Sequence, residues 1–205
     1  MKKSIDEHAA RFDEWAAEYD DDATPEYRAC ADLVVDHAAP TPEDTVLDLG
    51  TGTGAIALAL APQAGRVVGR DISEGMLEQA RTKASEQGLD NVEFGVGRFR
   101  EPNVDGIDVD IVVSNFAMHH LSDEEKREAI GVIAGLNPRR FVLGDVMFFG
   151  EPDPDEPFYT PEVDDPSTVG VLADALTDAG FALTAVEMVH EQVGVLVAER
   201  GREES

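Results

Sequence analysis

The sequence predicts an α/β fold in which a mostly parallel, doubly wound sheet carries helices on both faces. Three observations lead to this class. Short apolar runs alternate with amphipathic helical patterns along the chain, as β-α-β units require. The first apolar run leads directly into a turn of alternating glycines. The last two apolar runs are separated by three polar residues, which favours an antiparallel hairpin at the end.

Each element has its own local signal. Ser73 begins a helix that Gly88 ends, and Ser122 with Glu125 fits a capping box. Five prolines within sixteen residues make 151–166 a loop. We expect helices over 4–20, 25–39, 55–61, 73–87, 122–135 and 166–179. We expect strands over 45–49, 66–71, 92–96, 108–114, 140–148, 181–189 and 193–199.

Length and composition favour one domain spanning residues 1–205. With 42% hydrophobic residues, a chain of this length can bury one core. We expect an N-terminal helical lid over 1–39, a core over 40–199 and a disordered tail over 200–205. The N-terminus has no apolar segment behind its lysines, and no run of 18 apolar residues occurs, so we expect a soluble cytoplasmic protein without a membrane partner.

Charge is the most unusual feature of the composition. Asp and Glu number 43 against 16 Lys and Arg, a formal net charge of −27 spread along the whole chain. Such an acidic surface favours a halophilic protein working in high salt. Because no Lys/Arg stripe could neutralise phosphates, a nucleic-acid partner is not expected. Cys30 is the only cysteine, so we predict no disulfide, no thiolate cluster and no metal site, and interpret Cys30 as a helix-packing residue.

The stretch VLDLGTGTGAIALAL, residues 46–60, predicts a ligand-binding turn. Gly50, Gly52 and Gly54 follow a buried strand and precede a helix, where missing Cβ atoms permit a tight turn and close approach of a ligand. Asp71 ends the next strand, where an acid can accept hydrogen bonds from both ribose hydroxyls. Asp48 lies just before the turn and could accept from loop amides or a ligand ammonium group. We therefore predict a nucleoside site.

Together these residues resemble the class I S-adenosylmethionine-dependent methyltransferases, whose first motif is an acid-x-Gly-x-Gly-x-Gly turn. VVGRDISEGMLEQAR, NVEFGVGRFREP and DIVVSNFAMHHL are similar to the segments that follow in that family. The resemblance implies a Rossmann-like, seven-stranded sheet of order 3-2-1-4-5-7-6. It also implies S-adenosylmethionine as cofactor and S-adenosylhomocysteine as product. The cofactor residues that it implies are Asp48, Gly50, Thr51, Gly52, Thr53, Gly54, Asp71, Ile72, Met76, Gly97, Arg98, Phe99, Ser114, Asn115 and Phe116.

One residue departs from the family pattern. Arg98 stands where the family commonly has an Asp that accepts from the adenine amino group, and a guanidinium cannot accept. Adenine would then be held by the backbone, by Phe99, or by stacking on Arg98.

Three residues are candidates for catalysis. His119 and His120 would border the acceptor site, and one of them could act as a general base, with packing or helix capping as the alternative role. Tyr19, in a stretch that resembles a lid helix, could reach the cofactor carboxylate or the acceptor, or could pack with Phe12 and Trp15. Phe158 and Tyr159 could line the acceptor site or belong to a solvated loop. No catalytic residue is assigned beyond these candidates.

The acceptor class is only partly constrained. SNFA replaces the Asn/Asp-Pro-Pro-aromatic motif of enzymes that methylate amino groups of nucleic-acid bases or glutamine. The acids required for metal-dependent catechol methylation are also absent, since Asn115 and the pair Asp145-Val146 stand in their places. The pattern is similar to small-molecule methyltransferases such as those of quinone biosynthesis. A nucleoside-binding sensor without transferase activity and a nicotinamide-dependent oxidoreductase are the alternative functions. The oligomeric state is not predicted.

Overall fold

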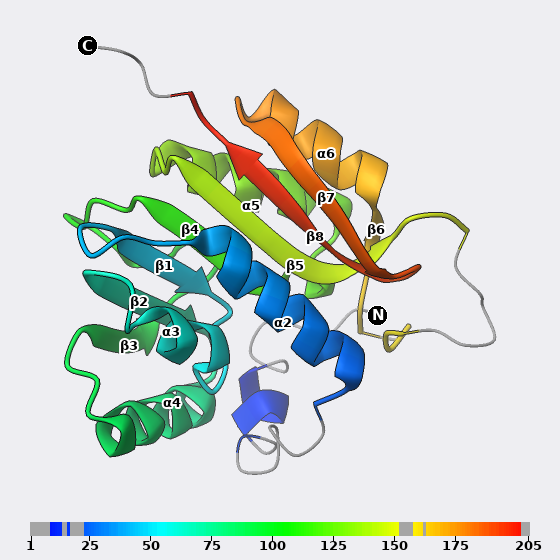
Figure 1. The fold of residues 1–205 in the computed structure, drawn as a ribbon. Coiled ribbons are helices and arrows are strands. Elements are labelled where there is room, and N and C mark those ends of the chain that lie inside the picture. The colour runs from blue at the N-terminus through cyan, green and yellow to red at the C-terminus, as the bar shows by residue number, and fades with distance from the viewer. Residues whose placement is uncertain (1–8, 14–15, 17–22, 152–157, 162, 202–205) are drawn as a thin grey trace.

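The computed structural model describes residues 9–13, 16, 23–151, 158–161 and 163–201. One sheet of order β3-β2-β1-β4-β5-β8-β7 forms its centre, with β6 paired to β5 beside this path (Figure 1). Strands β1 to β5 run parallel, whereas β8 is antiparallel to both β5 and β7. The strands are β1 Thr45–Leu49, β2 Arg66–Asp71, β3 Val92–Val96, β4 Ile111–Asn115, β5 Arg140–Phe148, β6 Ser167–Thr168, β7 Ala182–His190 and β8 Val193–Glu199.

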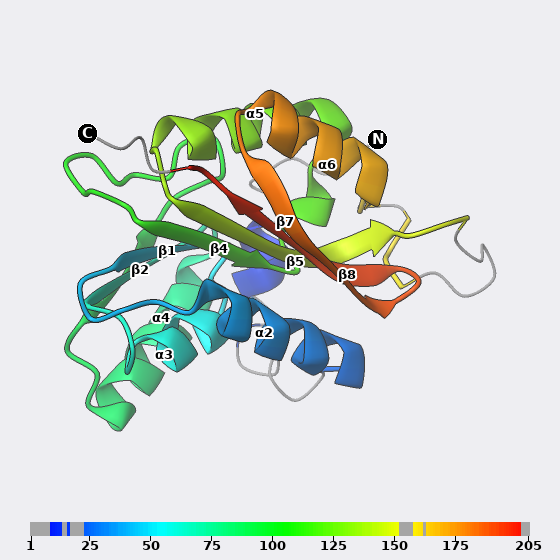
Figure 2. The same cartoon turned by 45° about the horizontal axis from the view of Figure 1, so that its top comes forward.

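Helices cover both faces of the sheet (Figure 2). α2, α3 and α4 lie on one face, and α5 and α6 pack together on the other. The helices are α2 Pro25–Ala38, α3 Ala55–Leu60, α4 Glu74–Gln87, α5 Asp123–Gly135 and α6 Val169–Asp178, with a short 3₁₀ helix η1 at Met118–His120. None of the helices in the described part of the chain has the length and apolar character needed to cross a membrane.

The core consists of two apolar layers separated by the sheet. In β1, Leu47 and Leu49 face the layer under α5 and α6, whereas Val46 faces the layer under α2 and α3. This alternation follows from the two-residue period of a strand. The buried thiol of Cys30 lies in the second layer and contacts the carbonyl oxygen of Gly194 at 3.7 Å, as expected for a packing residue.

The predicted fold class and strand order are confirmed. The capping box is also present, because Ser122 Oγ accepts from the N–H of Glu125 while the Glu125 carboxylate accepts from the N–H of Ser122. An eighth strand, β6, was not predicted. It lies where we expected the start of α6, which instead begins at Val169 because the side chain of Thr168 accepts from the N–H of Val171.

Three expected boundaries differ in the structure. β4 begins at Ile111 and not at residue 108; Asp110, just before it, bonds to Thr45 through both its side chain and its N–H. α2, which we expected to belong to a lid, packs along β4, β5 and β8. Arg200, expected in the tail, donates to the carbonyl of Ala179 at 2.8 Å and stacks over Phe181. Residues 202–205 lie outside the described part.

Candidate active site

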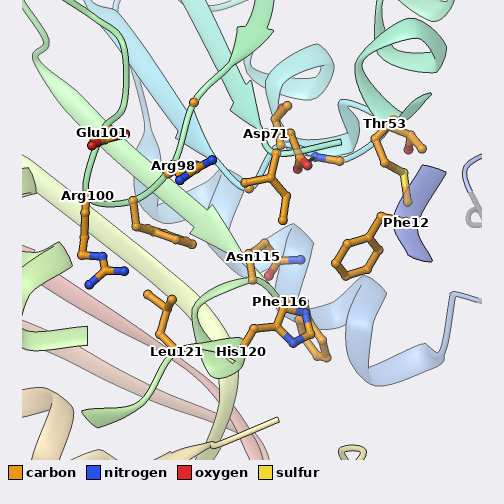
Figure 3. Close-up of a pocket in the computed structure, with 18 of the residues that line it drawn as sticks. Phe12, Thr53, Asp71, Arg98, Arg100, Glu101, Asn115, Phe116, His120 and Leu121 are labelled. Atoms are coloured by element: carbon orange, nitrogen blue, oxygen red, sulfur yellow. Dashed lines mark hydrogen bonds between the residues drawn. The ribbon is translucent and has the colours of Figure 1, made fainter. Parts of the chain in front are cut away.

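A cavity of about 350 Å³ opens at the carboxyl ends of β1, β2 and β4. This is the edge of an open α/β sheet at which ligands bind, next to the point where strand order reverses. Asp71 and Arg98 lie on one side of the cavity, and Phe116, His120 and Leu121 lie on the other, with Asn115 between them (Figure 3). The cavity therefore joins a polar end to an apolar end.

The three glycines of the turn between β1 and α3 have positive φ angles but different surroundings. A Cβ on Gly50 would lie 2.3 Å from Ala117 Cβ, and one on Gly54 would lie 3.1 Å from Ala80 Cβ. A Cβ on Gly52 would meet no atom within 4 Å. Gly50 and Gly54 thus permit close packing within the protein, whereas only Gly52 leaves open space for a ligand beside its backbone. Contact of the three glycines with a ligand stays a prediction: Gly50 and Gly52 line the cavity, whereas Gly54 does not.

Asp71 is placed at the cavity wall by two backbone hydrogen bonds. Its Oδ2 accepts from the N–H of Gly52 at 2.8 Å, and its Oδ1 accepts from the N–H of Ser73 at 2.9 Å. Burial raises the pKa of Asp71, although these backbone donors favour its ionised form. Each carboxylate oxygen retains a second lone pair. The carboxylate can therefore accept two further hydrogen bonds from a ligand, as a ribose diol would require.

Asp48 lies behind the turn and not in the cavity wall. Its Oδ2 accepts from Thr51 Oγ1 at 2.6 Å, while Oδ1 has no hydrogen-bond partner among the described residues. Burial raises the pKa of Asp48 to about 7, against the effect of the Thr51 hydrogen bond. Because Thr51 lines the cavity, Asp48 controls the conformation of the turn from behind.

Asn115, the last residue of β4, borders the cavity and carries a buried, unpartnered amide. Its side chain is 6% exposed, and neither Oδ1 nor Nδ2 has a hydrogen-bond partner in the described part of the chain. Buried amides without partners are rare and cost about 1–3 kcal/mol each. Asn115 lines the cavity, but both amide atoms are buried, so its side chain would have to turn toward the cavity to bond a ligand.

Most of the predicted cofactor residues lie together. Twelve of them line the cavity: Gly50, Thr51, Gly52, Thr53, Asp71, Ile72, Met76, Gly97, Arg98, Phe99, Asn115 and Phe116. Asp48, Gly54 and Ser114 do not. Arg98 reaches the wall from a tight turn in which its backbone pairs with Glu101.

Several lining residues were not predicted as site residues. They are Phe12, Tyr27, Arg100, Glu101, Ala117, Leu121 and Glu125. Phe12 and Tyr27 are far in sequence from the glycine turn. No local sequence pattern distinguishes an aromatic residue that lines a ligand site from one that packs in a core. Glu125 was recognised in the sequence only as the second residue of the capping box, and that role gave no reason to place it at a ligand site.

The N-terminal segment reaches the site through residues 9–13, which are helical. Asp13 Oδ1 accepts from Ser73 Oγ at 2.5 Å and from the N–H of Gly75 at 2.9 Å. These bonds attach the segment to the start of α4 and place Phe12 in the cavity wall. The candidates Trp15 and Tyr19 lie outside the described residues.

The two candidate histidines have different environments. His120 lines the cavity, whereas His119 is 7% exposed behind it and does not. Phe158 and Tyr159 were candidates either for the acceptor site or for a solvated loop, and neither lines the cavity. Phe158 packs against the His190 ring and Tyr159 against Phe148.

Comparison with known proteins gives the family. Residues 46–136 match the methyltransferase domain family. An uncharacterized methyltransferase of Bacillus velezensis is 29% identical over 83% of this chain and 88% of its own length. One of Bacillus pumilus is 30% identical over 69% of this chain and 68% of its own length. Magnesium protoporphyrin IX methyltransferase of Synechocystis, solved with bound S-adenosylmethionine, is 25% identical over 85% of this chain and 77% of that chain, with a TM-score of 0.65.

Fold, site and comparisons agree: the chain belongs to the class I S-adenosylmethionine-dependent methyltransferases. It is a methyl-transferring enzyme whose cofactor is S-adenosylmethionine, as the resemblance implied.

Proposed function

We propose that this enzyme transfers the methyl group of S-adenosylmethionine to a small-molecule acceptor that enters the apolar end of the cavity. The main observation in support of this proposal is that a single cavity runs from the Asp71 carboxylate past Asn115 to Phe12, Phe116 and Leu121. A volume of about 350 Å³ suits a small ligand.

At the polar end, Asp71 would bind the ribose. Its carboxylate is already oriented by the N–H groups of Gly52 and Ser73, so little conformational freedom is lost on binding. Hydrogen bonds to an ionised carboxylate contribute about 1.5–3 kcal/mol. Ile72, Met76 and Phe99 would enclose the adenine, and Arg98, a donor only, would stack on the ring or donate to a ring nitrogen.

In the middle of the cavity, Asn115 and the turn would hold the methionine part. Asn115 borders this space, and its buried, unpartnered amide would bond the ligand's ammonium or carboxylate group after a turn of the side chain. The open space beside Gly52 allows a ligand to approach the backbone. Both features fit an amino acid moiety at this position, and Asp48 with Thr51 would keep the turn in place.

Catalysis would depend chiefly on positioning. The sulfonium of the bound cofactor supplies an activated methyl group, so no covalent bond to the protein is required. The residues of the apolar end orient the acceptor for in-line attack and exclude water, a contribution that can reach about 7–11 kcal/mol when alignment is good. Phe116 lies where the two ends of the cavity meet, with its ring 5.1 Å from the ring of Tyr27.

Isothermal titration calorimetry and label transfer test this proposal. In high potassium chloride the protein should bind S-adenosylmethionine and S-adenosylhomocysteine but not NAD. Incubation with S-adenosyl-[methyl-³H]methionine and a cell extract should label the low-molecular-mass fraction. Label found only in protein or nucleic acid would refute a small-molecule acceptor. Cofactor binding with no labelled fraction would favour a sensor.

A further inference from the structure

Four ionisable side chains lie together beneath the apolar end of the cavity. His119 and His120 belong to η1, Asp145 to β5, and Asp164 to the loop before β6. Nδ1 of His119 lies 2.5 Å from Asp145 Oδ1, and Nδ1 of His120 lies 2.7 Å from Asp164 Oδ1. The two imidazole rings are neighbours, with centroids 4.1 Å apart. The cluster therefore consists of two His-Asp pairs in contact.

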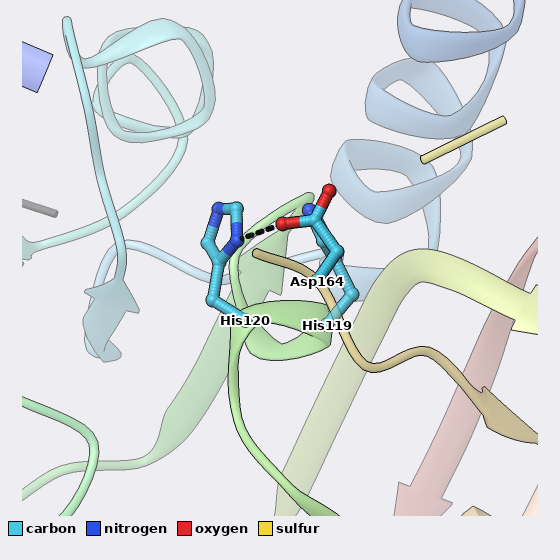
Figure 4. Close-up of side chains that lie close together, drawn as sticks. All are labelled: His119, His120 and Asp164. Atoms are coloured by element: carbon cyan, nitrogen blue, oxygen red, sulfur yellow. Dashed lines mark hydrogen bonds and ion pairs between the residues drawn. The ribbon is translucent and has the colours of Figure 1, made fainter. Parts of the chain in front are cut away.

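Only one of these four residues reaches the cavity. His120 lines it, whereas the other three do not. Figure 4 shows that the His120 nitrogen facing Asp164 is the one joined by the dashed line, while the second ring nitrogen points away from the carboxylate. When Nδ1–H donates to Asp164, the lone pair is on Nε2. Asp164 thus selects the tautomer in which Nε2 can accept a proton.

Asp164 is itself firmly placed. Its Oδ2 accepts from the N–H of Thr160 at 2.7 Å, and the N–H of the next residue, Asp165, donates to the carbonyl of His119 at 2.7 Å. The loop is therefore attached to η1 by backbone and side-chain bonds together. Such a carboxylate can hold an imidazole in one orientation, as a positioning group for a base must.

A metal ion is the competing explanation for this cluster. His119, His120 and Asp164 have potential ligand atoms within 4.8 Å of one another. The observed hydrogen bonds argue against an ion, because Nδ1 of His119 already pairs with Asp145 and Nδ1 of His120 with Asp164.

We propose that His120 is the general base of the methyl transfer, positioned by Asp164, and that the acceptor is a flat, apolar molecule with a hydroxyl group of phenol or enol type. This inference rests on the proposed function. The acceptor class follows from the wall around His120, where Phe12 lies 5.5 Å from its ring between centroids and Phe116 and Leu121 complete the apolar surface. A hydroxyl of this kind is weakly nucleophilic until its proton is removed.

In the proposed methyl transfer, the acceptor oxygen loses its proton to Nε2 of His120 and forms a bond to the methyl carbon, while the electron pair of the broken S–C bond remains on sulfur. The products are a methyl ether, S-adenosylhomocysteine and a His120 imidazolium, which returns the proton to water. Asp164 stabilises that imidazolium.

The protonation states of the cluster support the role. Burial lowers the pKa of His120, and the positive charge of His119 lowers it further, so the ring is neutral and ready to accept a proton. Burial alone would also lower the pKa of His119, but Asp145 raises it above its ordinary value. The other ionisable groups that line the cavity on this side are Glu125 on α5 with its ion-pair partner Arg100, the neighbouring Glu101, and Tyr27 on α2.

A series of phenols tests the base directly. Phenol, 4-methylphenol and 4-nitrophenol are supplied with S-adenosylmethionine, and release of S-adenosylhomocysteine is measured. His120→Gln should lower kcat/KM for 4-methylphenol by about 10²–10⁴-fold. It should change the value for 4-nitrophenol, which is largely ionised at about pH 8, by less than about tenfold. His37→Gln, on α2 outside the cavity, is the matched control and should resemble the wild type.

Asp164 requires a readout beyond activity. In the cofactor-free protein, ¹⁵N NMR should find neutral His120 with its proton on Nδ1, and Asp164→Asn should shift this population toward the Nε2–H tautomer. The same variant should move the acidic limb of the pH–rate profile, and Asp164→Glu should restore much of both. An Nε2–H tautomer in the wild type would refute the assignment.

The remaining outcomes separate the two proposals. Equal losses on all three phenols in His120→Gln, or no turnover of any phenol by wild type that binds S-adenosylhomocysteine, would overturn the base and acceptor class while the proposed function stands. Failure to bind S-adenosylhomocysteine would overturn the proposed function itself. Stoichiometric zinc or manganese binding that disappears in His120→Gln and Asp164→Asn would make the cluster a metal site and refute the base.

Discussion

Alanine substitutions at Gly50 and Gly52 should have different main effects, on stability at Gly50 and on cofactor binding at Gly52. Both have positive φ, +72° and +53°, so alanine introduces left-handed strain of about 1–2 kcal/mol at either position. At Gly50 the new Cβ would lie 2.3 Å from Ala117 Cβ, where about 3.5–4 Å is the normal separation of carbon atoms. Overpacking of that kind costs a further 1–3 kcal/mol or so.

The expected loss for Gly50→Ala is therefore about 2–5 kcal/mol of the free energy of unfolding. For a chain of this size that corresponds to a fall in Tm of roughly 4–20 °C. Gly52→Ala should lose only the strain, but its Cβ enters the space beside the cofactor. A steric cost of about 1–3 kcal/mol there weakens S-adenosylhomocysteine binding about 5–150-fold.

Differential scanning calorimetry and titration calorimetry measure the two effects separately. The double variant Gly50→Ala/Ala117→Gly is the control. Removing the Ala117 Cβ should recover the stability lost to overpacking, while the loss due to backbone strain at residue 50 remains. Wild-type affinity in Gly52→Ala would refute the assignment of its open side to the cofactor. Equal Tm values for Gly50→Ala and Gly52→Ala would refute the contact argument.

Three further predictions concern charge. Asp71→Asn should weaken S-adenosylhomocysteine binding about 10–150-fold by calorimetry, because a charge-assisted hydrogen bond contributes about 1.5–3 kcal/mol; unchanged affinity would exclude Asp71 from the ribose site. Burial lowers the pKa of His119, but the Asp145 carboxylate outweighs this effect and raises it above its ordinary value. The His119–Asp145 pair therefore contributes its full stability below about pH 6.5, and this contribution is lost as the pH rises through the folded-state pKa of His119. Denaturant unfolding should show this fall in the wild type and not in His119→Gln, and parallel pH profiles would contradict it. With a net charge of −27, Tm should rise by several degrees between about 0.1 and 2 M potassium chloride as self-repulsion is screened, and a salt-independent Tm would argue against a halophilic protein.

Local sequence patterns were sufficient for the elements and their order. The alternation of apolar runs and helical stripes fixed five parallel strands, and the spacing between the last two runs indicated the hairpin. Caps placed α4 and α5 because their signals lie within four residues of the helix start. β6 could not be foreseen, since two residues that pair with the end of β5 have no period of their own.

For the site, sequence reasoning worked where a residue's place follows from the strand that precedes it. Asp71, Asn115 and the glycine turn each end a strand, and parallel strands bring those ends to one edge. Phe12 and Tyr27 could not be found in this way, because they come from helices whose docking is decided by packing. The choice between the two roles considered for Phe158 and Tyr159 could not be made from sequence, because proximity to β5 along the chain does not fix which side of the sheet edge a loop covers.

By itself, the sequence determined the fold class, the cofactor turn and the acidic surface, because these depend on short-range periodicity, glycine geometry and composition. Only the tertiary structure decided which glycine has open space beside it and which of two adjacent histidines lines the cavity. It also decided that Asp164, 44 residues further along, is the partner of His120. These properties depend on what packs against a residue from elsewhere in the chain, and no local pattern encodes that.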